Sequence, residues 1–493
     1  MRSYISKKEF LARCAGGPIP PLSVEVHYSD PAYIYSAFRN AKTILLQSGK
    51  GPEHISRFSF ITFDPYMELK VKNGRVETII NGKRTISFQR PLSKLRKILG
   101  AYDQLNDPQL PPFQGGAIGL ISYDFVHYFE RLPVTVKDDL LIPDAHFLIV
   151  DKVVSFDQKL KKAWVVICPG ARERAFTDNI SDIDLSLAYD RAVEEIQDVL
   201  KRLENIVVPE MRSRSKNGKE IFYEMERPYY VDMVKRAKEY IRAGDIFQAN
   251  LSQRVSADMG GTDTWDMYRK LFEINPSPFA SYADLGDYVI VSSSPERLVR
   301  LRNGIADTRP IAGTRPRGRD HREDERMRRE LILNKKERAE HIMLIDLERN
   351  DIGKVCDYGT VEVDELMITE DYSHVIHIVS NVKGRMAENK DCFDLVRATF
   401  PGGTITGVPK VRCMEIIDEL EPVKRGPYTG SIGYIGYSGI MDMNIVIRTF
   451  VCKDERSYVH VGAGIVADSD PEKEYLETLK KAEALIKTLN EVG

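Results

Sequence analysis

Three strand-like runs lie close together near the carboxyl end of the chain: GSIGYIGYSG (430–439), NIVIRTFV (444–451) and YVHVGAGIV (458–466). Around them, further strand-like runs alternate with long helical patterns at 323–350 and 472–490. The alternation lacks the regular strand–helix–strand spacing of a parallel sheet, and the chain contains neither a GxGxxG nor a P-loop motif. The sequence therefore predicts an α+β fold with antiparallel sheets.

The amino-terminal part, to about residue 170, also reads as strands and turns. KNGR (72–75) and NGKR (81–84) are Asn-Gly turn signals between β-rich runs. Two consecutive hairpins are expected there.

The middle of the chain is different in character. A helical period predicts a helix over 183–204, a charged irregular stretch at 209–220 is the best linker candidate, and a second helix should run from 229 to 243 and stop at Gly244. These boundaries divide the chain into an amino-terminal region (1–170), a helix and linker (171–223) and a carboxyl-terminal region (224–493).

Composition excludes several classes of protein. The 493 residues have a formal net charge of −2, which gives no bulk electrostatic footprint for nucleic acid. No apolar run is long enough to span a membrane, and MRSYISKKEFLARC has no secretory h-region, so a cytoplasmic location is expected. The six cysteines form no CxxC pair, and none lies in a Gly-x-Cys-x-Gly turn that would expose a nucleophile.

Four glycine-rich loops in the second half join Gly, Ser and Thr to charged residues: 308–318, 400–410, 430–436 and 462–471. Each could be an ordinary turn, but together they favour a pocket for a small anion, because glycine lets backbone N–H groups approach a ligand.

Two acidic pairs have a spacing that places both carboxylates on one helix face: Glu337/Glu340 and Glu474/Glu477. Roughly eleven such pairs are expected by chance, and most are solvated helix faces. Their chemical use would be to hold Mg²⁺. His377 lies in an apolar run, where a hydrogen-bonded core histidine is the commoner case.

At this point the motifs amount to a resemblance. The chain resembles the chorismate-binding family, which includes anthranilate synthase component I, aminodeoxychorismate synthase component I and the isochorismate and salicylate synthases. The ordered motifs that carry it include GDIFQANLSQR (244–254), SSPE (293–296), RPIAGTRPRG (309–318), ERAEHIMLIDLERNDIG (337–353), FPGGTITGVPKVR (400–412), IVIRT (445–449) and EYLETLKKA (474–482). The resemblance implies two large antiparallel β-sheets packed face to face with helices outside.

Position by position, the resemblance also implies roles. It implies Mg²⁺ ligation by Glu340 and Glu477, with Glu337 and Glu474 holding the waters of the ion. It implies Glu296 as the general acid and His377 and Thr404 at the reacting ring. It implies substrate binding by Tyr434, Arg448 and Lys481, with Gly462 and Gly464 lining the pocket.

The nucleophile and the carbon that it attacks are a separate question. Water-using members carry a lysine where this chain has Gln248, which favours ammonia. FQANLSQR, SSSPER, FPGGTITGVPK and GSIGYIG look like the aminodeoxychorismate branch, which aminates C4. Many members of that branch have a lysine at the position of Ala312 that adds to ring C2 and is later displaced, whereas PIAGT, as here, is the usual anthranilate synthase form. LLQS and NPSPFASY depart from the family's tryptophan site, so Gln47 and Ser48 mark a degraded site.

These signals predict aminodeoxychorismate synthase component I, with anthranilate synthase component I as the alternative. The expected partner is a separate glutamine amidotransferase subunit that supplies ammonia. The presence of all four glutamates argues against a catalytically silent subunit.

Overall fold

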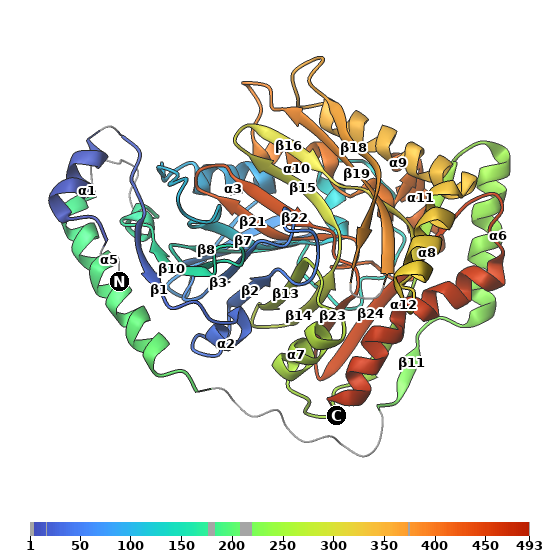
Figure 1. Ribbon diagram of the computed structural model, residues 1–493, viewed down its shortest axis with the longest axis horizontal. Coiled ribbons are helices and arrows are strands. Elements are labelled where there is room, and N and C mark those ends of the chain that lie inside the picture. Colours follow the sequence, from blue (N-terminus) through green and yellow to red (C-terminus); the bar gives the residue numbers. More distant parts are fainter. Residues whose placement is uncertain (1–3, 16, 176–182, 208–218, 373–374, 493) are drawn as a thin grey trace.

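The computed structural model describes residues 4–15, 17–175, 183–207, 219–372 and 375–492, and contains two large antiparallel sheets of 12 strands each (Figure 1). The predicted linker at 209–220 falls almost wholly outside these residues. Each sheet takes strands from both ends of the chain, as expected.

Sheet A has its strands in the order β1 (Leu22–Val26), β10 (Lys162–Ile167), β9 (Lys152–Asp157), β3 (Phe58–Thr62), β2 (Thr43–Gln47), β13 (Phe279–Asp284), β14 (Val289–Ser294), β23 (Thr449–Lys453), β24 (Arg456–Ile465), β12 (Gln248–Asp258) and β11 (Ile221–Tyr223), with β20 (Gly407–Val408) also beside β12. Sheet B has the order β17 (Ile311–Pro316), β19 (Val375–Arg385), β16 (Ile305–Thr308), β15 (Arg297–Arg302), β22 (Met441–Asn444), β21 (Ser431–Gly436), β7 (Gly116–Ile121), β8 (Ala145–Val150), β4 (Met67–Lys72), β5 (Arg75–Ile80) and β6 (Lys83–Ser87), with β18 (Glu362–Asp371) against β19.

The described α-helices are α1 (Lys7–Cys14), α2 (Pro31–Tyr35), α3 (Pro91–Leu99), α4 (Ala171–Arg174), α5 (Leu185–Glu204), α6 (Arg227–Ala243), α7 (Thr264–Ile274), α8 (His321–Leu333), α9 (Lys335–Gly353), α10 (Cys392–Thr399), α11 (Lys410–Leu420) and α12 (Pro471–Glu491). Two 3₁₀ turns, η1 (Tyr123–Tyr128) and η3 (Gly403–Ile405), lie between elements. Helices α6, α8, α9, α11 and α12 gather at the right of Figure 1, opposite α1 and α5. No helix in the described part of the chain is long and apolar enough to cross a membrane.

The two sheets pack face to face over a shared apolar layer. Side chains from sheet A meet side chains from sheet B in one buried cluster that includes Ile44, Phe60, Ile290, Ile118, Leu148 and Ile432. Strands supply such a layer because alternate side chains point to opposite faces. The predicted α+β fold is confirmed.

The two predicted hairpins are confirmed, and the turn residues explain them. β4 pairs with β5 and β5 with β6. Asn73 and Gly74 have φ of 49° and 79°, and Asn81 and Gly82 have φ of 49° and 76°. Two successive residues with positive φ are what a two-residue hairpin turn requires, and Asn-Gly tolerates them best.

The expected helices are confirmed except in one place. α5, α6 and α12 form where predicted, and α6 ends at Gly244 with φ of 82°. The single long helix expected over 323–350 is instead two helices, α8 and α9, divided at Asn334. The Asn334 side chain accepts hydrogen bonds from the backbone N–H groups of Lys336 and Glu337, both at 3.1 Å, so it begins a new helix where continuation was expected.

Candidate active site

Glu296 lies between β14 and β15 with its side chain buried. One carboxyl oxygen, Oε1, has no hydrogen-bond partner among the described residues. Burial, together with the nearby Glu348 carboxylate, raises the pKa of Glu296 to about 8 against the opposing effects of Thr404 and Arg448. A carboxyl group in this environment stays protonated near neutral pH, as a general acid must.

His377 lies on β19 opposite Thr314 of β17. Its Nδ1 is 3.2 Å from the Gly313 carbonyl oxygen and 3.0 Å from the Thr314 hydroxyl, whereas its Nε2 has no partner among the described residues. Burial, together with the Arg448 charge, lowers the pKa of His377 to about 4. A neutral ring whose Nδ1–H donates to Gly313 therefore presents Nε2 as a free acceptor.

Two positions on β24, where it pairs with β12, require glycine. A Cβ atom at Gly462 would lie 2.5 Å from Asn250 Oδ1 and 2.6 Å from the Tyr428 hydroxyl, and one at Gly464 would lie 2.6 Å from Gln248 Nε2. The side chains of Gln248, Asn250 and Tyr428 thus lie directly against bare backbone. No larger residue fits at either glycine without displacing them.

Two cations belong to the site, at different places. Lys481 Nζ donates to the Gly462 carbonyl oxygen at 2.9 Å and pairs with Glu477 Oε1 at 2.9 Å. The buried Arg448 is instead close enough to Glu296 and His377 for its charge to affect the pKa values of both. Burial lowers the pKa of Arg448, although Glu296 opposes that shift. A guanidinium that forms no ion pair with a described residue suits a ligand carboxylate.

Several polar atoms of the candidate site residues are buried without a hydrogen-bond partner among the described residues. They include Gln248 Oε1, Asn250 Oδ1, Glu296 Oε1, Glu337 Oε2, Glu348 Oε2 and His377 Nε2, and such atoms also occur elsewhere in the described chain. Native proteins leave few such atoms unsatisfied, because each costs roughly 1–3 kcal/mol. A polar ligand that reached the site would complete the hydrogen bonding of these atoms.

The two acidic pairs come together from α9 and α12. Burial raises the pKa of Glu340, and the charges of Glu337, Glu474 and Glu477 raise it further. Burial likewise raises the pKa of Glu474, with a contribution from Glu477. Glu337 accepts a hydrogen bond from Arg315 at 2.7 Å through Oε1, while its buried Oε2 has no partner among the described residues. Clustered carboxylate oxygens that repel one another fit a hard cation.

These carboxylates do not form a tight all-protein cage. Among the described residues, the group whose ligand atoms all lie within 4.8 Å of one another is instead His54, Glu365 and Glu370. The Arg309 guanidinium contacts both glutamates of that group, so it is a partly buried ion-pair network. The looser arrangement on α9 and α12 is compatible with Mg²⁺, which keeps several waters and takes one or two carboxylates.

Comparison with known proteins identifies the family of this chain. Residues 41–487 match the family model described as chorismate binding enzyme. The chain is 42% identical to anthranilate synthase component 1 of Acetivibrio thermocellus over 96% of both chains. It is 40% identical to aminodeoxychorismate synthase component 1 of Bacillus subtilis (strain 168), covering 90% of this chain and 91% of that protein. The crystal structure of anthranilate synthase component I from Streptococcus pneumoniae TIGR4 superposes with a TM-score of 0.77 at 36% identity, covering 87% of this chain and 92% of that one.

The chain belongs to the chorismate-binding enzyme family. It is a chorismate-utilising enzyme of the anthranilate and aminodeoxychorismate synthase type.

The structure of this chorismate-binding enzyme does not bring Tyr434 to the other predicted site residues. Tyr434 is buried on β21, where its ring stacks on Phe113 at a centroid distance of 4.6 Å and meets Phe60 edge-on at 5.2 Å. The tyrosine beside Gly462 is Tyr428, six residues earlier. We therefore correct the placement of Tyr434. The sequence carries no signal that separates the two tyrosines, since both lie in the same glycine-rich stretch.

Three further residues complete the comparison with the sequence. Ala312 lies on β17 opposite Ile378. Its half-buried methyl side chain has no nucleophilic group that could attack the substrate ring. Glu348, which the sequence did not single out, is buried near Glu296, and burial raises its pKa to about 7. Gly403 N–H contacts Glu348 Oε1 at 3.4 Å, so this carboxyl supports the loop that carries Thr404.

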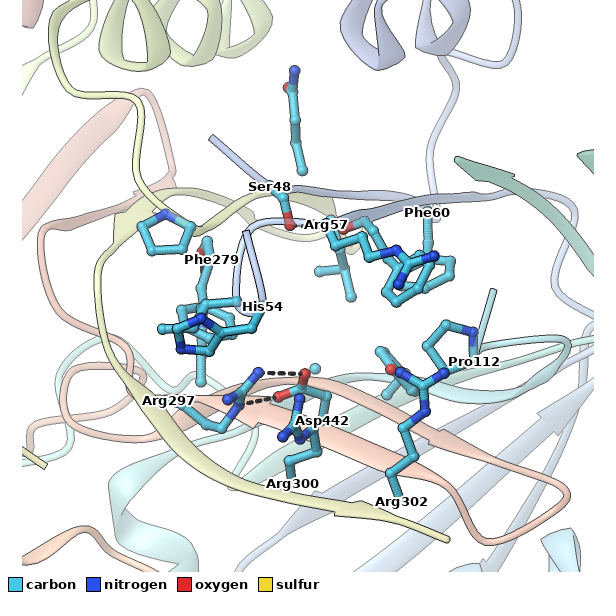
Figure 2. A pocket seen from close by; sticks show the side chains of 18 of the residues that line it. Ser48, His54, Arg57, Phe60, Pro112, Phe279, Arg297, Arg300, Arg302 and Asp442 are labelled. Atoms are coloured by element: carbon cyan, nitrogen blue, oxygen red, sulfur yellow. Dashed lines mark hydrogen bonds and ion pairs between the residues drawn. The ribbon is translucent and has the colours of Figure 1, made fainter. Parts of the chain in front are cut away.

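A second cavity of about 290 Å³ lies apart from these residues, and Tyr434 lines it (Figure 2). Gln47 and Ser48 line it too, as the two residues predicted to mark a degraded tryptophan site. Gln47 Oε1 accepts a hydrogen bond from the Tyr268 hydroxyl at 2.8 Å, and the Ser48 hydroxyl donates to the Phe58 carbonyl oxygen at 2.7 Å. Both side chains are thus engaged with the protein itself.

Proposed function

We propose that the enzyme aminates chorismate at C4 to give 4-amino-4-deoxychorismate, using ammonia. The observation that carries this choice is the state of Gln47. A tryptophan-regulated enzyme needs an anion for the amino group of that effector, whereas Gln47 is neutral and bonded to Tyr268. Lack of tryptophan control fits amination toward 4-aminobenzoate better than amination toward anthranilate.

The residues of the chain divide the chemistry among them. Arg448 and Lys481 hold the substrate carboxylates against the bare backbone of Gly462 and Gly464, and His377 and Thr404 orient the ring. Glu296 donates its proton as the C4–O bond breaks, so the hydroxyl leaves as water. The new C–N bond forms with ammonia, and the proton that the nitrogen loses can restore Glu296.

We also propose that Mg²⁺ binds between α9 and α12. Glu340 and Glu477 would hold it directly, with Glu337 and Glu474 bonded to its waters. The bound ion would neutralise the ring carboxylate and favour substitution on the ring. The partnerless Glu337 Oε2 and the mutual repulsion of these carboxylates support a cation here.

Ammonia should come from a separate glutamine amidotransferase subunit. All six cysteines are fully or partly buried, and burial raises their pKa values. A glutaminase nucleophile needs the opposite, an accessible thiolate. The purified chain should therefore use ammonium salts but turn over glutamine only with an added amidotransferase, and glutamine turnover by the chain alone would contradict this.

The alternative product is anthranilate. Ala312 favours it, because alanine cannot form the covalent bond to C2 that a lysine at this position would form on the way to C4 amination. Mass spectrometry of the product from chorismate, Mg²⁺ and ammonium separates the two. The proposed product keeps the enolpyruvyl group, whereas anthranilate formation releases pyruvate, which a coupled lactate dehydrogenase assay detects. Stoichiometric pyruvate together with anthranilate would overturn the proposal.

A further inference from the structure

We propose that the second cavity binds a small aromatic carboxylate that carries no ammonium group. The cavity lies where segments from both sheets meet, and its walls combine flat apolar rings with an excess of cationic side chains (Figure 2). The proposal concerns binding and does not depend on which carbon of chorismate is aminated.

The apolar walls fit a ring. Phe60, Phe279, Tyr434 and Pro112 line the cavity, and Tyr434 is itself fixed by stacking on Phe113. Rigid aromatic walls favour a planar ligand, because the ring faces pack with little loss of side-chain freedom. The volume of about 290 Å³ suffices for a monocyclic or bicyclic aromatic ring.

The carboxylates that line the cavity already have partners. Arg297 holds Asp442 through two hydrogen bonds, from Nε at 2.9 Å and from Nη2 at 3.1 Å. Glu53 pairs with Lys159 at 2.5 Å. Since these are the acidic residues of the wall, no free anion is left for a ligand ammonium group.

The cations are not matched in the same way. Arg57 is paired with Asp157, and Arg300 with Asp307, both outside the lining. Arg302 forms no ion pair with a described residue, and its guanidinium lies 5.6 Å from the centroid of the Phe58 ring. Figure 2 shows Arg57 and Arg302 reaching into the open space from opposite walls. A ligand carboxylate would therefore find a free guanidinium, which is the side chain best shaped to bind one.

The reaction itself leads to ligands of this class. Amination of chorismate at either ring carbon, followed by loss of the enolpyruvyl group as pyruvate, gives an aminobenzoate. An aminobenzoate is an aromatic carboxylate whose aryl amine is uncharged at neutral pH. The cavity could thus sense the aromatic acid that the product becomes.

Calorimetry on the full chain with four indole probes tests the charge preference: indole-3-propionate (carboxylate only), L-tryptophan (both charges), tryptamine (ammonium only) and indole (neither). We expect indole-3-propionate to bind at least tenfold more tightly than tryptophan, and tryptamine to bind most weakly. Both 2- and 4-aminobenzoate should compete with indole-3-propionate. Equal or tighter binding of tryptophan, or no binding by any probe, would overturn the proposal.

Aromatic acids could also enter the catalytic cluster, so variants must locate the binding. Arg302→Gln should lower indole-3-propionate affinity at least tenfold, and Arg302→Lys should retain part of it. Arg319→Gln, which alters an arginine with 93% of its side chain exposed, is the matched control and should change nothing. Unchanged affinity in a folded Arg302→Gln protein would overturn the proposal, whereas the identity of the reaction product would stand or fall separately.

Discussion

Glu296 and Arg297 are neighbours in the chain at the start of β15, yet only Arg297 lines the second cavity. Glu296 lies in the catalytic cluster, where its Oε1 and several surrounding polar atoms lack partners among the described residues. Arg297 lines the second cavity and is satisfied by Asp442, with Asp307 a further 3.5 Å contact. Polar atoms of the catalytic cluster lack partners that a substrate could supply. In the second cavity, by contrast, the lining carboxylates are paired, and Arg302 forms no ion pair with a described residue. The difference shows that the ligand each site can bind depends on which of its polar and charged groups lack a protein partner, and not on burial alone.

A substitution at Glu296 should cause the largest loss of activity. Glu296→Gln keeps the shape of the side chain but removes the acidic proton, so product formation should fall about 10²–10⁴-fold. Steady-state kinetics with saturating Mg²⁺ and ammonium measures the loss. Affinity of the cavity for indole-3-propionate should not change, which serves as the control for an intact fold.

Metal binding is the next largest effect. Glu340→Gln or Glu477→Gln removes a charge from a cation site built on few carboxylates, and activity should fall by orders of magnitude. A Mg²⁺ titration of each variant by activity, with thermal unfolding as the check on folding, tests this. Wild-type activity that persists in EDTA would contradict the prediction.

Ala312→Lys sharpens the choice of ring carbon. In a pocket shaped for C4 chemistry, the lysine should permit a covalent adduct at C2 and preserve 4-amino-4-deoxychorismate formation. In an anthranilate synthase pocket it would fill the space where ammonia attacks. Intact-protein mass spectrometry detects the adduct, and wild-type anthranilate formation that this change abolishes would establish the alternative.

Gln47→Glu should add to the second cavity a carboxylate that can bind a ligand ammonium group. Tryptophan affinity should then rise about tenfold, because a charge-assisted hydrogen bond is stronger than a neutral one. Calorimetry against wild type measures the gain, and Gln47→Ala is the matched control that removes the amide without adding charge. Tryptophan already bound at micromolar concentration by the wild type would count against the proposed function.

The smallest effect concerns pH. Glu296 must be protonated, and its pKa is raised to about 8, so kcat/KM should decline as the pH rises through about 8. His377 must be neutral, and its lowered pKa of about 4 leaves it so throughout the neutral range. Activity should therefore show an alkaline limb that Glu296→Gln abolishes. An alkaline limb that survives in that variant would assign it to another group.

Some features were determined by the sequence because they depend on local contacts. The Asn-Gly pairs at 73–74 and 81–82 determined two hairpins, since asparagine and glycine adopt positive φ at little cost wherever the strands lie. The apolar period of α5 likewise predicted a helix that buries one face. The spacing of Glu337 with Glu340 and of Glu474 with Glu477 placed each pair on one helix face.

Other features depended on contacts between distant segments. Only packing decided that α9 and α12 bring their carboxylates together and that Tyr428 rather than Tyr434 faces Gly462. The second cavity combines β2, β15 and β21, each more than a hundred residues from the next in the sequence. The sequence sets the residue type at each position, but the face that a strand buries, and the pocket it then lines, follow from which strands pair beside it and which sheet packs over it.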